Sequence, residues 1–145
     1  MNPPIGESNL ATLLATLQPE LQPTVFVFCT IGPEVALPQG LSYVCQFYEQ
    51  EGTTLILPQA EADRAHLPYH YRCRQITLKV HSSLAAVGLL ATVTQALAAE
   101  GISGNVVSAY FHDHLFVPSD RATDAVFCLE RVALQAISNL DNQTD

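Results

Sequence analysis

Along residues 76–80 apolar and polar positions alternate with a period of two, and the pattern then changes to the period of a helix. The strand places its apolar residues on one face: Ile76, Leu78 and Val80. The stretch 84–100 places its apolar residues on one side of a helix: Val87, Leu90, Val93, Leu97 and Ala98. Ser82 and Ser83 are typical N-cap residues between the two. A strand that leads directly into a helix N-terminus predicts a corner that favours anions.

Two more strands and a second helix come next in the chain. The segment 105–118 reads as two strands that meet at His112-Asp113-His114. The next helix begins near Asp120, and its apolar residues recur at helical spacing: Val126, Leu129, Val132 and Ile137. Residues 75–137 therefore have the order β-α-β-β-α of a ferredoxin-like unit, with two helices on one face of an antiparallel sheet. The polar residues 138–145 are expected to fray.

The first half of the chain repeats features of the second. Leu55–Pro58 and Leu115–Pro118 share a Leu-x-x-Pro pattern, and an acidic, alanine-rich stretch follows each. Echoes in the same order indicate a duplication. Two prolines and two glycines within 32–42 leave no room for a long helix after the first strand, 24–31. We expect the amphipathic stretch 10–17 to fill the place of that missing helix.

The strings ITLKVHSSL (76–84) and GISGNVVSAYFHDHLFVP (101–118) resemble the ACT domains of small bacterial tandem-ACT proteins. The resemblance is strong over 72–131 and weaker over 8–71. It implies an α+β fold of tandem ferredoxin-like (βαββαβ) units, with antiparallel sheets and helices on one face. The units are then 1–71, which is degenerate, and 72–137, followed by the polar tail 138–145.

The resemblance also implies a function, which is the non-catalytic binding of a small molecule, an amino acid, by a regulatory or sensor protein. In this family the strand-to-helix loop typically carries an acidic residue and Pro-Gly, but here only Gly88 fits that pattern. The alternative is a structural or protein-interaction module that dimerises through its sheets without a small ligand.

Candidate ligand-binding residues surround the predicted corner. Ser82 and Ser83 either only cap the helix or also receive a carboxylate. Gly88 marks either the close approach of a ligand or tight packing on the sheet. Asn105 either offers a donor and an acceptor to an amino acid or closes the preceding turn. The residues that we expect to line the site are His81, Ser82, Ser83, Val87, Gly88, Asn105, Val106, His112 and Asp113.

The segment His112-Asp113-His114 leaves three interpretations open: an exposed turn, part of a small-molecule pocket, or a metal site. Spacing fixes only two ligands, whereas a stable site needs three or four, so we predict neither a metal nor a cofactor. The sequence has no nucleophile elbow, phosphate-binding glycine loop or zinc-protease motif, so we predict no enzyme and no catalytic residue. A metal-dependent enzyme that uses His81, His112 and His114 is the weaker alternative.

The charge, the hydropathy and the cysteine content limit which partners and which compartment we expect. Six basic and fourteen acidic residues give a net charge of −8, which disfavours nucleic acid. The chain has no apolar run of about 18–20 residues, so no membrane span is expected. Four dispersed cysteines without a Cys-x-x-Cys motif are typical of reduced thiols in a cytoplasmic protein. Because both units look incomplete, with edge strands that need covering, we also expect a homodimer.

Overall fold

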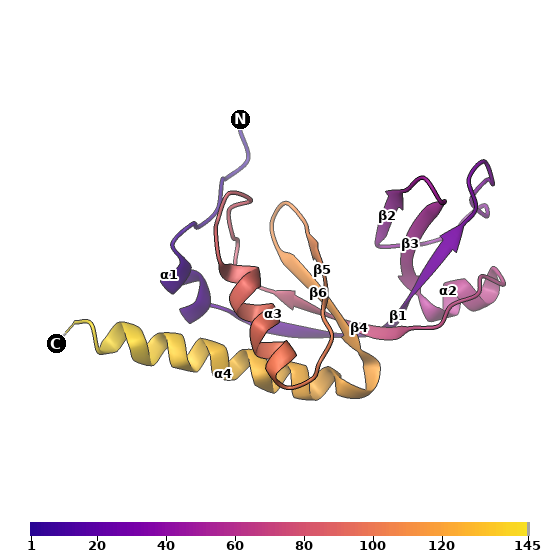
Figure 1. Cartoon of the computed structure of the whole chain (residues 1–145). Coiled ribbons are helices and arrows are strands. Elements are labelled where there is room, and N and C mark those ends of the chain that lie inside the picture. Colours follow the sequence, from indigo (N-terminus) through magenta and orange to yellow (C-terminus); the bar gives the residue numbers. More distant parts are fainter. Residues whose placement is uncertain (145) are drawn as a thin grey trace.

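The computed structural model describes residues 1–144 and builds them around one six-stranded antiparallel sheet (Figure 1). In chain order the elements are α1 (Leu10–Ala15), β1 (Pro19–Ile31), β2 (Cys45–Tyr48), β3 (Thr53–Pro58), α2 (Gln59–Arg64), β4 (Arg72–Leu78), α3 (Leu89–Ala99), β5 (Asn105–Ser108), β6 (Asp113–Pro118), the short 3-10 helix η1 (Ser119–Arg121) and α4 (Ala122–Asp141). The strand order is β2-β3-β1-β4-β6-β5. The predicted β-α-β-β-α order is confirmed as β4, α3, β5, β6 and α4.

The two halves of the sheet share their central strands. β1 is 13 residues long and pairs with β3 through its C-terminal residues and with β4 mainly through its N-terminal residues. The N-terminal half is therefore β2-β3-β1 completed by β4, and the C-terminal half is β5-β6-β4 completed by β1. Each half has the strand order of a ferredoxin-like unit, so the prediction of tandem ferredoxin-like units is confirmed.

A local two-fold relation connects the halves. Phe26 of β1 lies opposite Cys73 of β4. Phe26 also pairs with Pro58 at the end of β3, and Cys73 pairs with Pro118 at the end of β6. The pair Phe26–Cys73 therefore lies on the pseudo-two-fold axis, and each position in one half has an equivalent in the other. This register confirms that the Leu-x-x-Pro echo marks a structural repeat.

The helices lie on one face of the sheet, as predicted, over two unequal cores. The larger core is under α1, α3 and α4, and its most deeply buried side chains are Leu13, Ile76, Leu78, Val93, Leu97, Leu115, Val117, Ala125 and Leu129. The smaller core is beside α2, and its buried residues are Val27, Cys29, Ile31, Leu55, Leu57 and Ala62. Because Leu13 of α1 lies in the larger core, the expectation that residues 10–17 fill the gap in the first half is wrong. The part of β1 that comes after α1 pairs with β4, and this pairing holds α1 over the C-terminal half.

Both helices of the C-terminal half differ from their predicted limits. α3 begins at Leu89 rather than near Leu84, because Gly88 has φ +101°, a left-handed conformation that ends the preceding loop. Ser82 and Ser83 are therefore not its caps. α4 continues to Asp141, so the predicted fraying from residue 138 is wrong up to that point. Residues 122–141 contain no glycine or proline to stop the helix.

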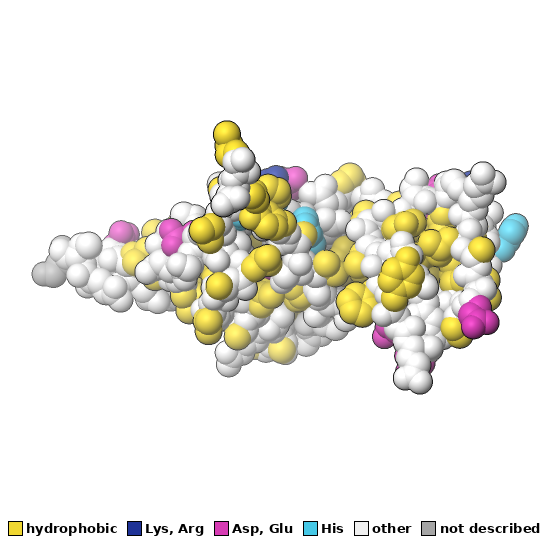
Figure 2. Space-filling model, turned by 90° about the horizontal axis from the view of Figure 1, so that it is seen from above, with side chains coloured by type: hydrophobic (Ala, Val, Ile, Leu, Met, Phe, Trp, Pro, Cys, Tyr) yellow, Lys and Arg dark blue, Asp and Glu magenta, His cyan; other side chains and the backbone are white. Residues whose placement is uncertain are grey.

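The face of the sheet that the helices leave open is concave and rich in aromatic side chains. Phe116 makes edge-to-face contacts with Phe26 and Phe28, at ring-centroid distances of 5.8 Å and 5.9 Å. Figure 2 shows apolar side chains gathered over the half of the molecule that contains β2 and β3. None of the helices in residues 1–144 has the length and apolar character of a membrane span.

Candidate functional site

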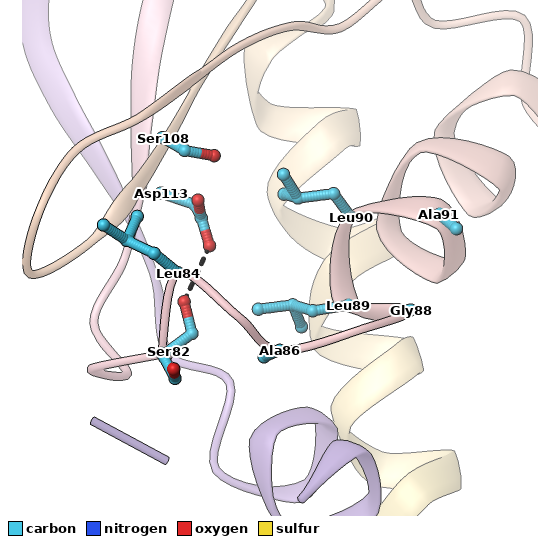
Figure 3. A pocket seen from close by; sticks show the side chains of 10 residues that line it. Ser82, Leu84, Ala86, Gly88, Leu89, Leu90, Ala91, Ser108 and Asp113 are labelled. Atoms are coloured by element: carbon cyan, nitrogen blue, oxygen red, sulfur yellow. Dashed lines mark hydrogen bonds between the residues drawn. The ribbon is translucent and has the colours of Figure 1, made fainter. Parts of the chain in front are cut away.

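A pocket of about 150 Å³ lies where the loop 79–88, the start of α3 and the β5–β6 hairpin meet (Figure 3). The loop contributes Ser82, Ser83, Leu84 and Ala86, the helix start contributes Gly88, Leu89, Leu90 and Ala91, and the hairpin contributes Ser108 and Asp113. We call it the helix-start pocket. Its walls come from segments that the strand pairing of β4 with β6 holds side by side.

One wall of this pocket is a helix N-terminus with unused donors. The first intrahelical hydrogen bond runs from Thr92 N to Gly88 O. Within residues 1–144, the N–H groups of Leu89, Leu90 and Ala91 donate to no acceptor, and no side chain caps the helix. The helix dipole and these free N–H groups favour an anion at this wall. α3 is 11 residues long, so its dipole is well developed.

The opposite wall carries a buried carboxylate. Asp113 is only 6% exposed, and its side chain points toward the pocket in Figure 3. The Ser82 hydroxyl donates to Asp113 Oδ2 at 3.0 Å. Ser108 pairs with Asp113 across the hairpin and places a second hydroxyl beside it. A buried carboxylate costs free energy unless a donor or a cation satisfies it, and one hydroxyl leaves most of its acceptor capacity free.

The N-terminal segment holds the pocket loop from behind. Glu7 N donates to His81 O at 2.9 Å, and Ser83 N donates to Glu7 O at 2.7 Å. At the other end of the loop, Leu10 contacts the backbone of Gly88, because a Cβ built on that glycine would lie 3.0 Å from Leu10 Cδ2. The loop is therefore fixed at both ends by residues that do not line the pocket.

The structure brings four of the predicted ligand-binding residues together around this pocket: Ser82, Ser83, Gly88 and Asp113. The other five lie elsewhere. The His81 ring packs against Phe111, with ring centroids 5.1 Å apart, and Val87 points outward with 83% of its surface exposed. Asn105 and Val106 lie at the far end of β5, and His112 lies in the turn.

The sequence reasoning missed six of the lining residues: Leu84, Ala86, Leu89, Leu90, Ala91 and Ser108. A hairpin turn over residues 109–112 pairs Ser108 with Asp113, so the correct turn length would have identified Ser108. If Gly88 is recognised as a left-handed residue just before the helix, the next three residues follow as the ones with free backbone N–H groups.

His112 and His114 do not face this pocket, because side chains along β6 alternate between the two faces of the sheet. Asp113 and His114 are consecutive and face opposite sides of the sheet. His114 and His112 have ring centroids 6.4 Å apart. Among residues 1–144 no group of three or more His, Cys, Asp or Glu side chains is placed to hold a metal ion. The interpretation of His112-Asp113-His114 as a turn is wrong for the last two residues, which belong to β6.

Comparisons with known proteins agree with this architecture. Models of the ACT domain match residues 5–74 and residues 70–131. The chain is a tandem ACT-domain protein. It is similar to a Vibrio cholerae protein of unknown function, described as a possible transport protein, with 40% identity and a TM-score of 0.77. That match covers 86% of this chain and 95% of the Vibrio protein.

More distant structures share the tandem ACT fold. An Agrobacterium tumefaciens protein has 16% identity and a TM-score of 0.64, over 81% of this chain and 89% of its own. The ligand-free regulatory subunit of aspartate kinase from Thermus thermophilus has 10% identity and a TM-score of 0.57, over 81% of this chain and 98% of its own. At these identities the likeness concerns the fold alone. The comparison with curated proteins gives no match.

Proposed function

We propose that this tandem ACT-domain protein is a non-catalytic regulatory or sensor protein that binds a free amino acid in the helix-start pocket. One observation carries the proposal: the free N–H groups of α3 and the buried carboxylate of Asp113 face each other across the pocket. A free amino acid presents an α-carboxylate and an α-ammonium on one carbon. The helix start suits the first group, and Asp113 with Ser108 suits the second.

The remaining lining restricts the side chain of the ligand. Leu84, Leu89 and Leu90 supply apolar surface, and of the residues that the structure describes only Asp113 brings a charge to the pocket lining. A second charge on the ligand would be left without a partner, which is costly in a partly buried site. The pocket volume of about 150 Å³ leaves little room beyond the backbone of the amino acid. We therefore propose a small, uncharged amino acid.

The test is a thermal-shift screen of the proteinogenic amino acids. A ligand at about 100 times its dissociation constant adds about 2.7 kcal/mol to the free energy of unfolding, which is easily detected. Each amino acid that raises the melting temperature is repeated with Asp113→Asn, which keeps an acceptor for Ser82 but removes the charge. We expect the shift to disappear. A screen in which small uncharged amino acids have no effect would contradict the proposal.

A second candidate function, a dimerising interaction module, is favoured by the outer edge of β2. This edge strand exposes large apolar side chains, with Phe47 65% and Tyr48 78% exposed. Residues 43–48 contain no charged residue or proline, the usual means by which proteins protect an edge strand. We therefore propose that two copies pair through β2 as a homodimer. This function and amino-acid binding are compatible, because β2 and the helix-start pocket belong to different halves of the sheet.

A further inference from the structure

A second pocket lies on the concave face of the sheet, opposite the helices. Its volume is about 150 Å³. Val44 and Cys45 line it from one edge of the sheet, and Val107 and Ala109 line it from the other edge. β2 and β5 are the two ends of the strand order, so the curl of the whole sheet creates this pocket. We call it the concave-face pocket.

Its polar side is organised around His114. The Gln75 amide donates to His114 Nδ1 at 3.0 Å, and the Thr77 hydroxyl lies 3.0 Å from the same nitrogen. Because Nδ1 accepts the hydrogen bond from Gln75, the ring proton is on Nε2. Burial lowers the pKa of His114, which favours the neutral ring. Within the described part of the chain Nε2–H has no acceptor, and it is not sealed away from solvent.

The equivalent positions of the N-terminal half do not carry these groups. The strand register makes Phe28 the equivalent of Gln75 and Thr54 the equivalent of His114. The C-terminal half thus places an amide and an imidazole where an apolar ring and a small hydroxyl suffice for the same fold. Gln75 and Thr77 satisfy His114 Nδ1, but among residues 1–144 the ring's Nε2–H has no acceptor. A partly buried donor without a partner weakens packing, so a group of this kind on one half alone points to a use other than supporting the sheet.

We propose that the concave-face pocket is a second small-molecule site, which takes an uncharged, ring-sized compound with one hydrogen-bond acceptor for His114. The size is set by the volume, since an apolar cavity of about 150 Å³ holds a ring as large as benzene. Phe116 supplies an aromatic wall for such a ring. Among residues 1–144, no Lys, Arg, Asp or Glu lines the pocket, so no charge there compensates a charged ligand. This site does not depend on the helix-start pocket, which lies on the other face of the sheet.

Cys45 provides a built-in reporter. It lines the pocket and is partly exposed, whereas the other three cysteines, Cys29, Cys73 and Cys128, are buried. Burial raises the pKa of each of these three thiols, in Cys73 to about 12, so they form little reactive thiolate at neutral pH. Cys45 should therefore react first with N-ethylmaleimide, and mass spectrometry of the intact chain and its peptides gives the rate at each site.

The experiment measures Cys45 labelling with phenol, toluene and benzoate as probes. At about ten times its dissociation constant, phenol leaves about one tenth of the pockets empty, so labelling should slow about tenfold. Toluene lacks the acceptor and benzoate is charged, so both should protect less than phenol at equal concentration. Failure of phenol to slow the reaction would overturn the proposal, and equal protection by benzoate or by toluene would overturn the assigned ligand class.

Ala109→Phe supplies the matched variant, because Ala109 is exposed at the pocket mouth and a larger side chain there fills the space with little risk to the fold. Its control is Ala98→Phe, an exposed change on α3 away from both pockets. Phenol should protect Cys45 in the control and lose its effect in Ala109→Phe. Undiminished protection in Ala109→Phe would place phenol elsewhere and overturn the proposal.

Discussion

The N-terminal and C-terminal halves share a strand plan and differ in the connection after the first strand. In the C-terminal half, the loop 79–88 and α3 connect β4 to β5, whereas in the N-terminal half residues 32–44 connect β1 to β2 without a helix. The register makes Thr53 the equivalent of Asp113 and Tyr48 the equivalent of Ser108. Among residues 1–144, a free helix start and a buried carboxylate therefore face each other in the C-terminal half alone.

This difference separates the scaffold from the site. Both halves retain the same strands and the same register. Both also depend on the pairing of β1 with β4 at the centre of the sheet, because each half is completed by the first strand of the other. The helix after the first strand and the carboxylate at the start of the last hairpin strand are not needed for that pairing. We therefore propose that the amino acid binds to the C-terminal half and not to the N-terminal half.

The largest expected effect tests whether the halves fold as one unit. Leu129→Ala removes a fully buried side chain from the larger core, and Leu55→Ala does the same in the smaller core. Each should lower the free energy of unfolding by about 2–5 kcal/mol. Because β1 and β4 belong to both halves, each variant should shift one common transition in urea, monitored by circular dichroism. Separate transitions for the two halves would show that they fold independently.

The next largest expected effect is the loss of the dimer when the edge strand of one half, β2, is changed. Phe47→Lys places a charge on the exposed β2 edge and should convert a dimer into a monomer, because an unpaired lysine opposes strand pairing. Asn105→Lys, a change at an exposed position of β5, is the control and should leave the dimer intact. Sedimentation at tens of micromolar measures both. Only monomer mass for the unmodified chain would rule out the proposed homodimer.

A smaller effect is expected for two left-handed glycines, one in each half. Gly88 has φ +101° and Leu10 against it, whereas Gly40 has φ +72° and open space around it. Alanine at either position costs about 1–2 kcal/mol for the left-handed backbone. Only Gly88→Ala must also displace Leu10, so it should cost more and should weaken amino-acid binding. Equal losses of stability in urea unfolding, with binding unchanged, would show that the Leu10 contact does not position the pocket.

The smallest effect is the pH dependence from His114. Because burial lowers its pKa, the unfolded chain binds a proton more readily than the folded chain. The free energy of unfolding should therefore fall as the pH drops below about 6.5, the ordinary histidine value, and level off below the lowered pKa. His114→Asn keeps an acceptor for Gln75 and should reduce this slope, measured against His70→Asn, which removes an exposed imidazole. An unchanged slope in His114→Asn would contradict the assignment.

The sequence predicted the fold better than the site, for physical reasons. Hydrophobic periodicity and the Leu-x-x-Pro repeat identify strands and a duplication, because both reflect local burial. The start of α3 was missed because the left-handed conformation of Gly88 does not alter the apolar pattern. Asp113 was expected in the pocket, but its orientation depends on the length of the hairpin turn. The backbone hydrogen bond from Ser83 to Glu7 joins segments that are far apart in the chain, and hydrophobic periodicity gives no information about such contacts.

The most direct test of the central proposal compares an amino acid with its deaminated analogue in two proteins. An amino acid that passes the thermal-shift screen and the same acid without its amino group are titrated by calorimetry into the unmodified chain and into Asp113→Asn. If Asp113 holds the ammonium group, the unmodified chain should prefer the amino acid by at least about tenfold, since a charge-assisted hydrogen bond contributes about 1.5–3 kcal/mol. Asp113→Asn should bind both compounds with similar, weak affinity. An equal preference for the amino acid in both proteins would place the ammonium group elsewhere and contradict the proposed site.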